Sequence, residues 1–126
     1  AMDDPENDIK VYDLAGKYSG RSIGEGIFQA EAEGIALYDC GEGRGYWITT
    51  DQGNRKTWFR VFERGSLNYI GSIHGSKTRK TDGIAVTNQS FDGLPEGALL
   101  AVQADKGLSA IDWIAIRETL NLPACQ

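Results

Sequence analysis

Three short stretches of the chain place acidic or amide side chains beside a glycine, at the edge of a β-type run. They are Glu31–Tyr38, Thr50–Asn54 and Thr81–Val86. Carboxylate and amide oxygens are the ligands that hard cations such as Ca²⁺ prefer, and glycine lets the backbone bend tightly beside them. The residue types in these stretches therefore point to cation-binding chemistry at the ends of strands.

Basic residues flank two of these stretches. Arg55 and Lys56 follow the second stretch, and Lys77, Arg79 and Lys80 precede the third. These residues are candidates for binding phosphate, since positive charge offsets the charge of a polyanion. Short basic runs are also common on solvated surface loops, so both interpretations stay open. His74 is the only histidine, which leaves no Ser-His-Asp set and no catalytic residue identified.

The composition restricts the class of protein. The chain has 126 residues, of which 40% are hydrophobic and 25% charged, which favours one folded domain over disorder. The net charge of −5 argues against a nucleic-acid partner. We find no apolar run long enough for a membrane span and no signal peptide. We expect a flexible N-terminal extension or remnant at 1–8, one domain at 9–122 and a tail at 123–126.

Strand patterns dominate the chain. About nine β-type runs recur roughly every ten residues, separated by turns rich in Gly, Asn, Asp and Ser. The predicted strands are Ile9–Leu14, Lys17–Ile23, Gly34–Asp39, Gly45–Thr50, Trp58–Glu63, Tyr69–Ile73, Gly83–Thr87, Ala98–Gln103 and Ala110–Ile116. Only the segment from Trp113 to Leu120 carries a helical alternative.

The strands group into four-stranded meanders. One complete group spans 34–73, a second begins at 83, and 9–23 supplies the last two strands of a preceding group. Such meanders are typical of propeller blades, although a β-sandwich gives a similar spacing. Periodicity alone does not decide between these two folds.

The order of the motifs resembles that of the C-terminal blades of β-propeller phytases, which are calcium-dependent phosphatases that hydrolyse inositol hexakisphosphate. The matching segments are Val11–Leu14, Glu31–Tyr38, Gly45–Trp47, Thr50–Asn54, Tyr69–Gly71, Thr81–Val86 and Pro95–Gln103, with Trp113 in the final strand. No one segment is specific, whereas their collinear order across most of the chain is. The resemblance implies an all-β fold, an incomplete β-propeller of about two to two and a half four-stranded antiparallel blades.

The same resemblance implies a function and a site. The cofactor would be Ca²⁺, the substrate an inositol phosphate, and the location secreted or periplasmic. Self-association or a missing half of the propeller would complete the ring. The positions that match family ligands are Glu31, Glu33, Gln52 and Asp82. From residue types alone, the two glutamates could instead be solvated, while Gln52 and Asp82 could simply hold their turns.

Two positions depart from the family pattern. Lys80 and Ala104 stand where the family usually has aspartate, which repels a cation at one position and removes a ligand at the other. These departures favour an alternative function, that of a non-catalytic phytase-like module for binding or assembly.

The two cysteines, Cys40 and Cys125, leave two alternatives. They could form a disulfide that ties the tail to the first full blade, or remain free thiols. Their separation in sequence does not decide, because it says nothing about their distance in space.

Overall fold

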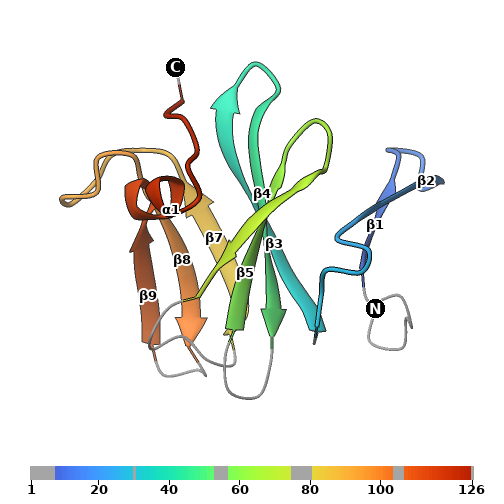
Figure 1. The fold of residues 1–126 in the computed structure, drawn as a ribbon, viewed down its shortest axis with the longest axis horizontal. Helices are drawn as coiled ribbons and strands as arrows, with labels where there is room; N and C mark the ends of the chain where they lie inside the picture. The colour runs from blue at the N-terminus through green and yellow to red at the C-terminus, as the bar shows by residue number, and fades with distance from the viewer. Residues whose placement is uncertain (1–7, 30, 53–56, 75–80, 104–106, 126) are drawn as a thin grey trace.

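The structure is a computed structural model, and it describes residues 8–29, 31–52, 57–74, 81–103 and 107–125 (Figure 1). The side chains at positions 31, 81, 82 and 103 lie outside this description. Predictions that fall on the remaining segments stay predictions. No described helix is long and apolar enough to cross a membrane.

Three antiparallel sheets follow one another along the chain. Each sheet is a simple meander in which neighbouring strands are consecutive in sequence. The first sheet pairs β1 (Ile9–Tyr12) with β2 (Tyr18–Ile23). The second contains β3 (Glu31–Gly41), β4 (Arg44–Gln52), β5 (Thr57–Glu63) and β6 (Tyr69–Ile73). The third contains β7 (Thr81–Thr87), β8 (Ala98–Gln103) and β9 (Gly107–Asp112).

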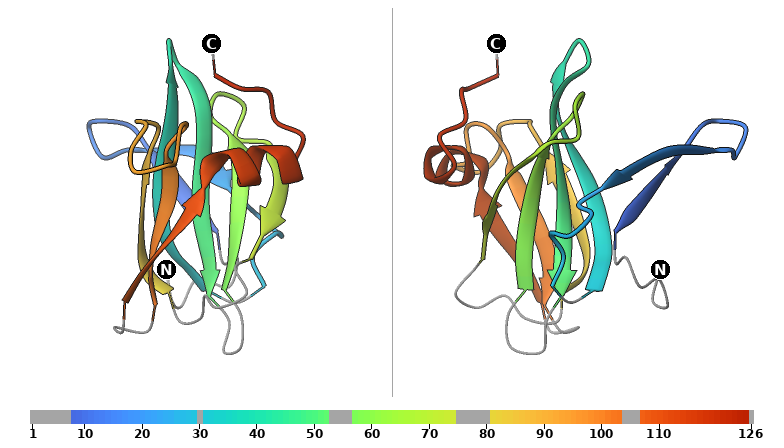
Figure 2. Two further views of the ribbon diagram at one scale, coloured as in Figure 1. Left: turned by 90° about the vertical axis from the view of Figure 1, so that its left-hand side faces the viewer. Right: turned by 45° about the vertical axis from the view of Figure 1, so that its right-hand side comes forward.

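This arrangement confirms the all-β, propeller-like prediction. The strands are grouped as two, four and three, so that one complete four-stranded blade lies between two partial ones. Figure 2 shows the hairpin of β1 and β2 extending away from the other two sheets. All nine predicted strands are present, and most differ from the prediction only at their ends.

The last strand was predicted wrongly. It was expected at Ala110–Ile116 with Trp113 inside it, but β9 ends at Asp112 and Trp113 begins helix α1 (Trp113–Thr119). The carboxylate of Asp112 accepts a hydrogen bond of 3.1 Å from the backbone N–H of Ile114, which caps the helix. Trp113 and Ile116 are both buried, and their spacing of three residues suits one face of a helix.

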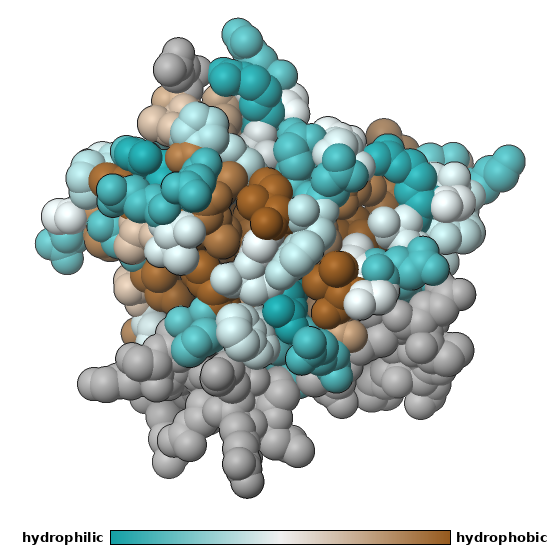
Figure 3. All heavy atoms as spheres, viewed as in Figure 1, coloured by the Kyte–Doolittle hydropathy of each residue, from teal (hydrophilic) through white to brown (hydrophobic). Residues whose placement is uncertain are grey.

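The main core lies where the second sheet, the third sheet and α1 meet. The ring of Trp113 stacks on that of Tyr38 in β3, with centroids 3.7 Å apart and planes 10° apart. Buried residues from all three elements complete the cluster: Ile48, Phe59, Val61, Leu99, Ala101 and Ile116. A smaller cluster of Ile23, Phe28 and Phe62 attaches the first hairpin to the complete blade. Figure 3 shows further apolar surface on the face that carries α1.

A disulfide joins Cys40 in β3 to Cys125 in the C-terminal tail. Their Cα atoms are 5.3 Å apart although 85 residues separate them in sequence. The alternative of two free thiols is therefore wrong for this structure. The bond ties the tail, and with it α1, to the complete blade.

Alkaline pH is expected to destabilise the fold through Tyr38. Burial, with a smaller contribution from the charge of Glu96, raises the pKa of this phenol from 10.0 to about 12. The phenol also donates a 2.7 Å hydrogen bond to the backbone oxygen of Glu96. Because the folded chain holds this proton more tightly than the unfolded chain, stability should be unaffected below pH 10 and should fall as the pH rises toward 12.

Denaturant unfolding at several pH values would measure this loss of stability. The Tyr38→Phe variant cannot ionise at this position, so its stability should fall less steeply over the same range. Tyr46, whose pKa is also raised by burial, is present in both proteins. Any loss of stability through Tyr46 is therefore the same in both and does not contribute to the difference between them. Identical slopes for the variant and the unmodified chain would contradict the assignment to Tyr38.

Candidate functional site

The predicted cation-binding positions lie at strand ends on one end of the molecule. We call this the site end: it is where β3, β5, β7 and β9 begin and where β4, β6 and β8 finish, at the bottom of Figure 1. Glu31, the first residue of β3, pairs in register with Gln52, the last residue of β4. Asp82 is the second residue of β7. All four predicted ligand positions, Glu33 included, are therefore at the site end.

The acidic segment around Glu33 is part of strand β3 and contains a bulge. In β3, Ala32 pairs with Asp51 and Ile35 pairs with Thr49, so Glu33 and Gly34 together oppose Thr50. The backbone N–H of Gly34 donates a 2.7 Å hydrogen bond to the hydroxyl of Thr50. A bulge of this kind redirects the side chain it contains, and Glu33 is exposed here.

A second bulge occupies the equivalent place in the next sheet. In β7, Thr81 pairs with Gln103 and Ile84 with Ala101, so Asp82 and Gly83 oppose one residue of β8. The first strands of two consecutive sheets thus carry the same feature, an acidic residue followed by glycine. The signal was present in the sequence as Glu33-Gly34-Ile35-Ala36 and Asp82-Gly83-Ile84-Ala85.

Gly34 lies against the first strand of the next sheet, with room for a Cβ at ordinary van der Waals distances. A Cβ at this position would lie 3.5 Å from Cγ1 of Ile84 in β7 and 3.4 Å from Oγ1 of Thr50 in β4. The strands β3 and β7 are in contact, and both begin at the site end. The two bulges therefore lie at the start of adjacent strands of consecutive sheets.

Gln52 faces Thr57 across the pair of β4 and β5. Gln52 is half-buried, whereas the side chain of Thr57 is fully buried. In the described part of the chain, Oγ1 of Thr57 has no hydrogen-bond partner. Buried hydroxyls are usually hydrogen-bonded, so this atom is an exception that needs an explanation.

The sequence analysis missed the ion pair of Asp51 and Arg60 beside these residues. Asp51 is 1% exposed and Arg60 is 6% exposed. Oδ2 of Asp51 accepts hydrogen bonds from Nη2 of Arg60 at 2.6 Å, from Nε of Arg60 at 3.1 Å and from the backbone N–H of Gln29 at 2.8 Å. Nη1 of Arg60 also donates to the hydroxyl of Ser72 at 2.9 Å. The carboxylate of Asp51 therefore stabilises the fold, although Asp51 is next to Gln52 in sequence.

The structure does not describe the five basic residues predicted to bind phosphate. Arg55 and Lys56 lie between β4 and β5, and Lys77, Arg79 and Lys80 between β6 and β7, all outside the described residues. The strand ends that flank both segments are at the site end. Among the described residues, no group of three or more His, Cys, Asp or Glu side chains could hold a metal ion. The side chains of Glu31 and Asp82 lie outside the described part of the chain, so the ligand set of Glu31, Glu33, Gln52 and Asp82 stays a prediction.

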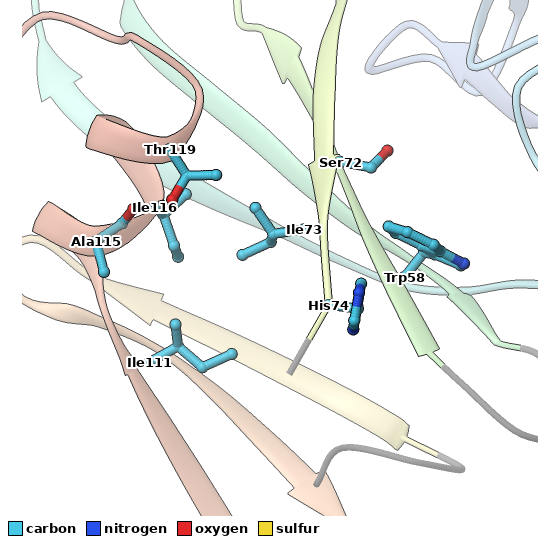
Figure 4. A pocket seen from close by; sticks show the side chains of 8 residues that line it. All are labelled: Trp58, Ser72, Ile73, His74, Ile111, Ala115, Ile116 and Thr119. Carbon is cyan, nitrogen blue, oxygen red and sulfur yellow. Dashed lines mark hydrogen bonds between the residues drawn. The ribbon is translucent and has the colours of Figure 1, made fainter. Parts of the chain in front are cut away.

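A pocket of about 470 Å³ lies beside the outer strand of the complete blade (Figure 4). Its lining residues are Trp58, Ser72, Ile73, His74, Ile111, Ala115, Ile116 and Thr119. The exposed His74 packs against the edge of Trp58, with ring centroids 4.6 Å apart. The hydroxyl of Thr119 donates to the backbone oxygen of Ala115, and that of Ser72 accepts from Arg60. With both hydroxyls engaged and a mostly apolar lining, the pocket does not suit a highly charged phosphate ester.

A comparison with protein families agrees with the arrangement of the strands. The family model described as phytase matches residues 6–109 of the chain. That range contains the first two sheets, β7, β8, the start of β9 and every predicted ligand position. No curated protein matches the chain.

Proposed function

Because the chain belongs to the phytase family, we propose that it takes part in the calcium-dependent release of phosphate from inositol hexakisphosphate. Membership of the family supports a hydrolase function and a phosphorylated small molecule as substrate. The identity of that substrate, the need for calcium and a secreted or periplasmic location are part of the proposal.

One observation carries the proposal beyond family membership. The register of β3 with β4 and the two bulges place Glu31, Glu33, Gln52 and Asp82 at the starts and ends of adjoining strands at the site end. The donor atoms these side chains offer are carboxylate and amide oxygens, which fit Ca²⁺ and other hard cations. The hydroxyl of Thr57, without a partner in the described part of the chain, adds a further polar atom beside Gln52 across β4 and β5.

Acidic and basic residues of the chain would have different roles at the site. The net charge of −5 repels a polyanion, so bound cations or a basic segment must offset that repulsion. The carboxylates at the site end would hold the cation, and the basic residues Arg55, Lys56, Lys77, Arg79 and Lys80 would bind substrate phosphates. Bound calcium supplies a Lewis acid that polarises a phosphoryl oxygen and lowers the pKa of water. The ion pair of Asp51 and Arg60 would hold the end of β4, which carries Gln52, against β5.

Calcium is expected to stabilise the folded chain, and the Gln52→Ala variant should lose much of this effect. A ligand at a hundredfold excess over its Kd adds about 2.7 kcal/mol to the free energy of unfolding. Thermal unfolding with and without millimolar calcium would measure the shift, beside an assay of phosphate release from inositol hexakisphosphate. Gln89→Ala is the matched control, because Gln89 is exposed and follows the opposite end of β7.

The outcomes of this experiment separate the two functions that the sequence leaves open. A calcium-dependent shift with phosphate release supports the enzyme, whereas a shift without release supports a non-catalytic binding module. No shift would contradict the calcium site.

The double variant Lys80→Asp, Ala104→Asp restores the residues usual in the family and should raise calcium affinity. An unchanged affinity would show that the family's ligand geometry does not apply to this chain.

A further inference from the structure

The fully buried Thr57 begins β5 at the site end. Its Oγ1 has no hydrogen-bond partner in the described part of the chain. A hydroxyl taken out of water without a partner destabilises the fold. Valine has almost the same shape and would avoid this loss, so packing alone does not account for a threonine here.

The position of Thr57 relates it directly to one predicted ligand. Thr57 pairs with Gln52 across β4 and β5, and Gln52 pairs with Glu31 across β3 and β4. Directly opposite residues share a face of the sheet, with Cβ atoms about 4.5–5.5 Å apart. Phe59 and Val61 follow Thr57 on the same face and belong to the core against the third sheet. Thr57 is therefore within reach of the Gln52 side chain, on the side facing the third sheet.

The chemistry of an amide indicates what Thr57 could do there. A glutamine that binds a cation must present Oε1 to it, which turns the two N–H groups of Nε2 away and leaves them in need of an acceptor. The hydroxyl of Thr57, which has no partner among the described residues, can accept such a bond and lies on the neighbouring strand. Mutation of groups that orient a metal ligand in this way typically lowers metal affinity by about 10–100-fold.

We propose that Thr57 is a positioning residue that accepts a hydrogen bond from Nε2 of Gln52 and thereby directs Oε1 of Gln52 toward the cation. This inference rests on the proposed calcium site. It adds a residue that does not itself bind the ion, and it explains a buried hydroxyl that has no hydrogen-bond partner among the described residues.

The test compares Thr57→Val with Thr57→Ser in the full chain. Calcium affinity, measured by titration calorimetry, should fall about tenfold in Thr57→Val, as expected for the loss of one hydrogen bond in a charged site. Thr57→Ser keeps the hydroxyl and should keep the affinity. Without calcium, Thr57→Val should melt at the same temperature as the unmodified chain or higher, because the unpartnered hydroxyl is gone. A residue with a purely structural role would not weaken calcium binding while leaving the ion-free fold as stable.

Two further variants make the test specific. In a Gln52→Ala background, Thr57→Val should cause no additional loss of calcium affinity, because there is no amide left to orient. Thr49→Val is the matched control: Thr49 is equally buried, but it lies on the other face of β4 and donates to the backbone oxygen of Arg60 at 3.4 Å.

Unchanged calcium affinity in Thr57→Val would overturn the inference and leave the calcium site standing. An equal loss with and without Gln52 would also overturn it. If the unmodified chain does not bind calcium, the proposed function and the inference both fail.

Discussion

Replacing Asp51 with asparagine is expected to lower the free energy of unfolding by about 3–5 kcal/mol, because it leaves the buried guanidinium of Arg60 without a counter-charge. Oδ2 of Asp51 accepts both hydrogen bonds from Arg60, at 2.6 and 3.1 Å, and a third from the backbone N–H of Gln29. Asparagine keeps the shape but removes the charge. Since small domains are stable by about 5–15 kcal/mol, this loss would leave the variant marginal.

Denaturant unfolding of the variant and the unmodified chain would measure this effect. Asp39→Asn is the matched control: Asp39 forms a 3.0 Å ion pair with Arg64, but its side chain is 57% exposed. Exposed pairs contribute about 0–1 kcal/mol, so this variant should be nearly as stable as the unmodified chain. Adding Arg60→Met to Asp51→Asn should recover part of the loss, because it removes the uncompensated charge. Equal stabilities of Asp51→Asn and Asp39→Asn would refute the account of a buried pair.

Trp113→Ala is expected to be comparably damaging, for a reason of packing rather than charge. Trp113 is 1% exposed and stacks on Tyr38, with ring centroids 3.7 Å apart, and a second aromatic contact joins it to Tyr46 at 5.8 Å. Truncating a buried tryptophan costs about 3–5 kcal/mol, through lost burial and the cavity left behind. Because this ring lies where α1 meets both larger sheets, its loss should loosen the contact between them.

The same unfolding experiment would test this prediction, with near-ultraviolet circular dichroism as a second measurement of aromatic packing. Trp58→Ala is the matched control, since Trp58 is only half-buried and lies at the pocket beside His74. We expect a clearly smaller loss there. If the two tryptophan variants were equally stable, Trp113 would not be the centre of the core.

Local patterns were enough to predict most of the fold. Short β-type runs bounded by turn residues predicted Tyr69–Ile73 and Ala98–Gln103 with the bounds that the structure has. The grouping into meanders followed because short turns make consecutive strands pair. The predicted end of the last strand was wrong because Ala110–Ile116 is a mostly apolar run that suits either a strand or a helix. The capping of α1 by Asp112 decided for the helix after residue 112.

The sequence by itself determined an all-β chain of blade-like meanders in the phytase family, with oxygen-bearing side chains at recurring strand ends. Those features depend on residue type and spacing along the chain. Only the tertiary structure decided which polar residues serve the fold. It paired Asp51 with Arg60, joined Cys40 to Cys125 and left the hydroxyl of Thr57 buried opposite Gln52. Each of these results depends on which strands are neighbours and which face of a sheet is buried, and local sequence carries neither.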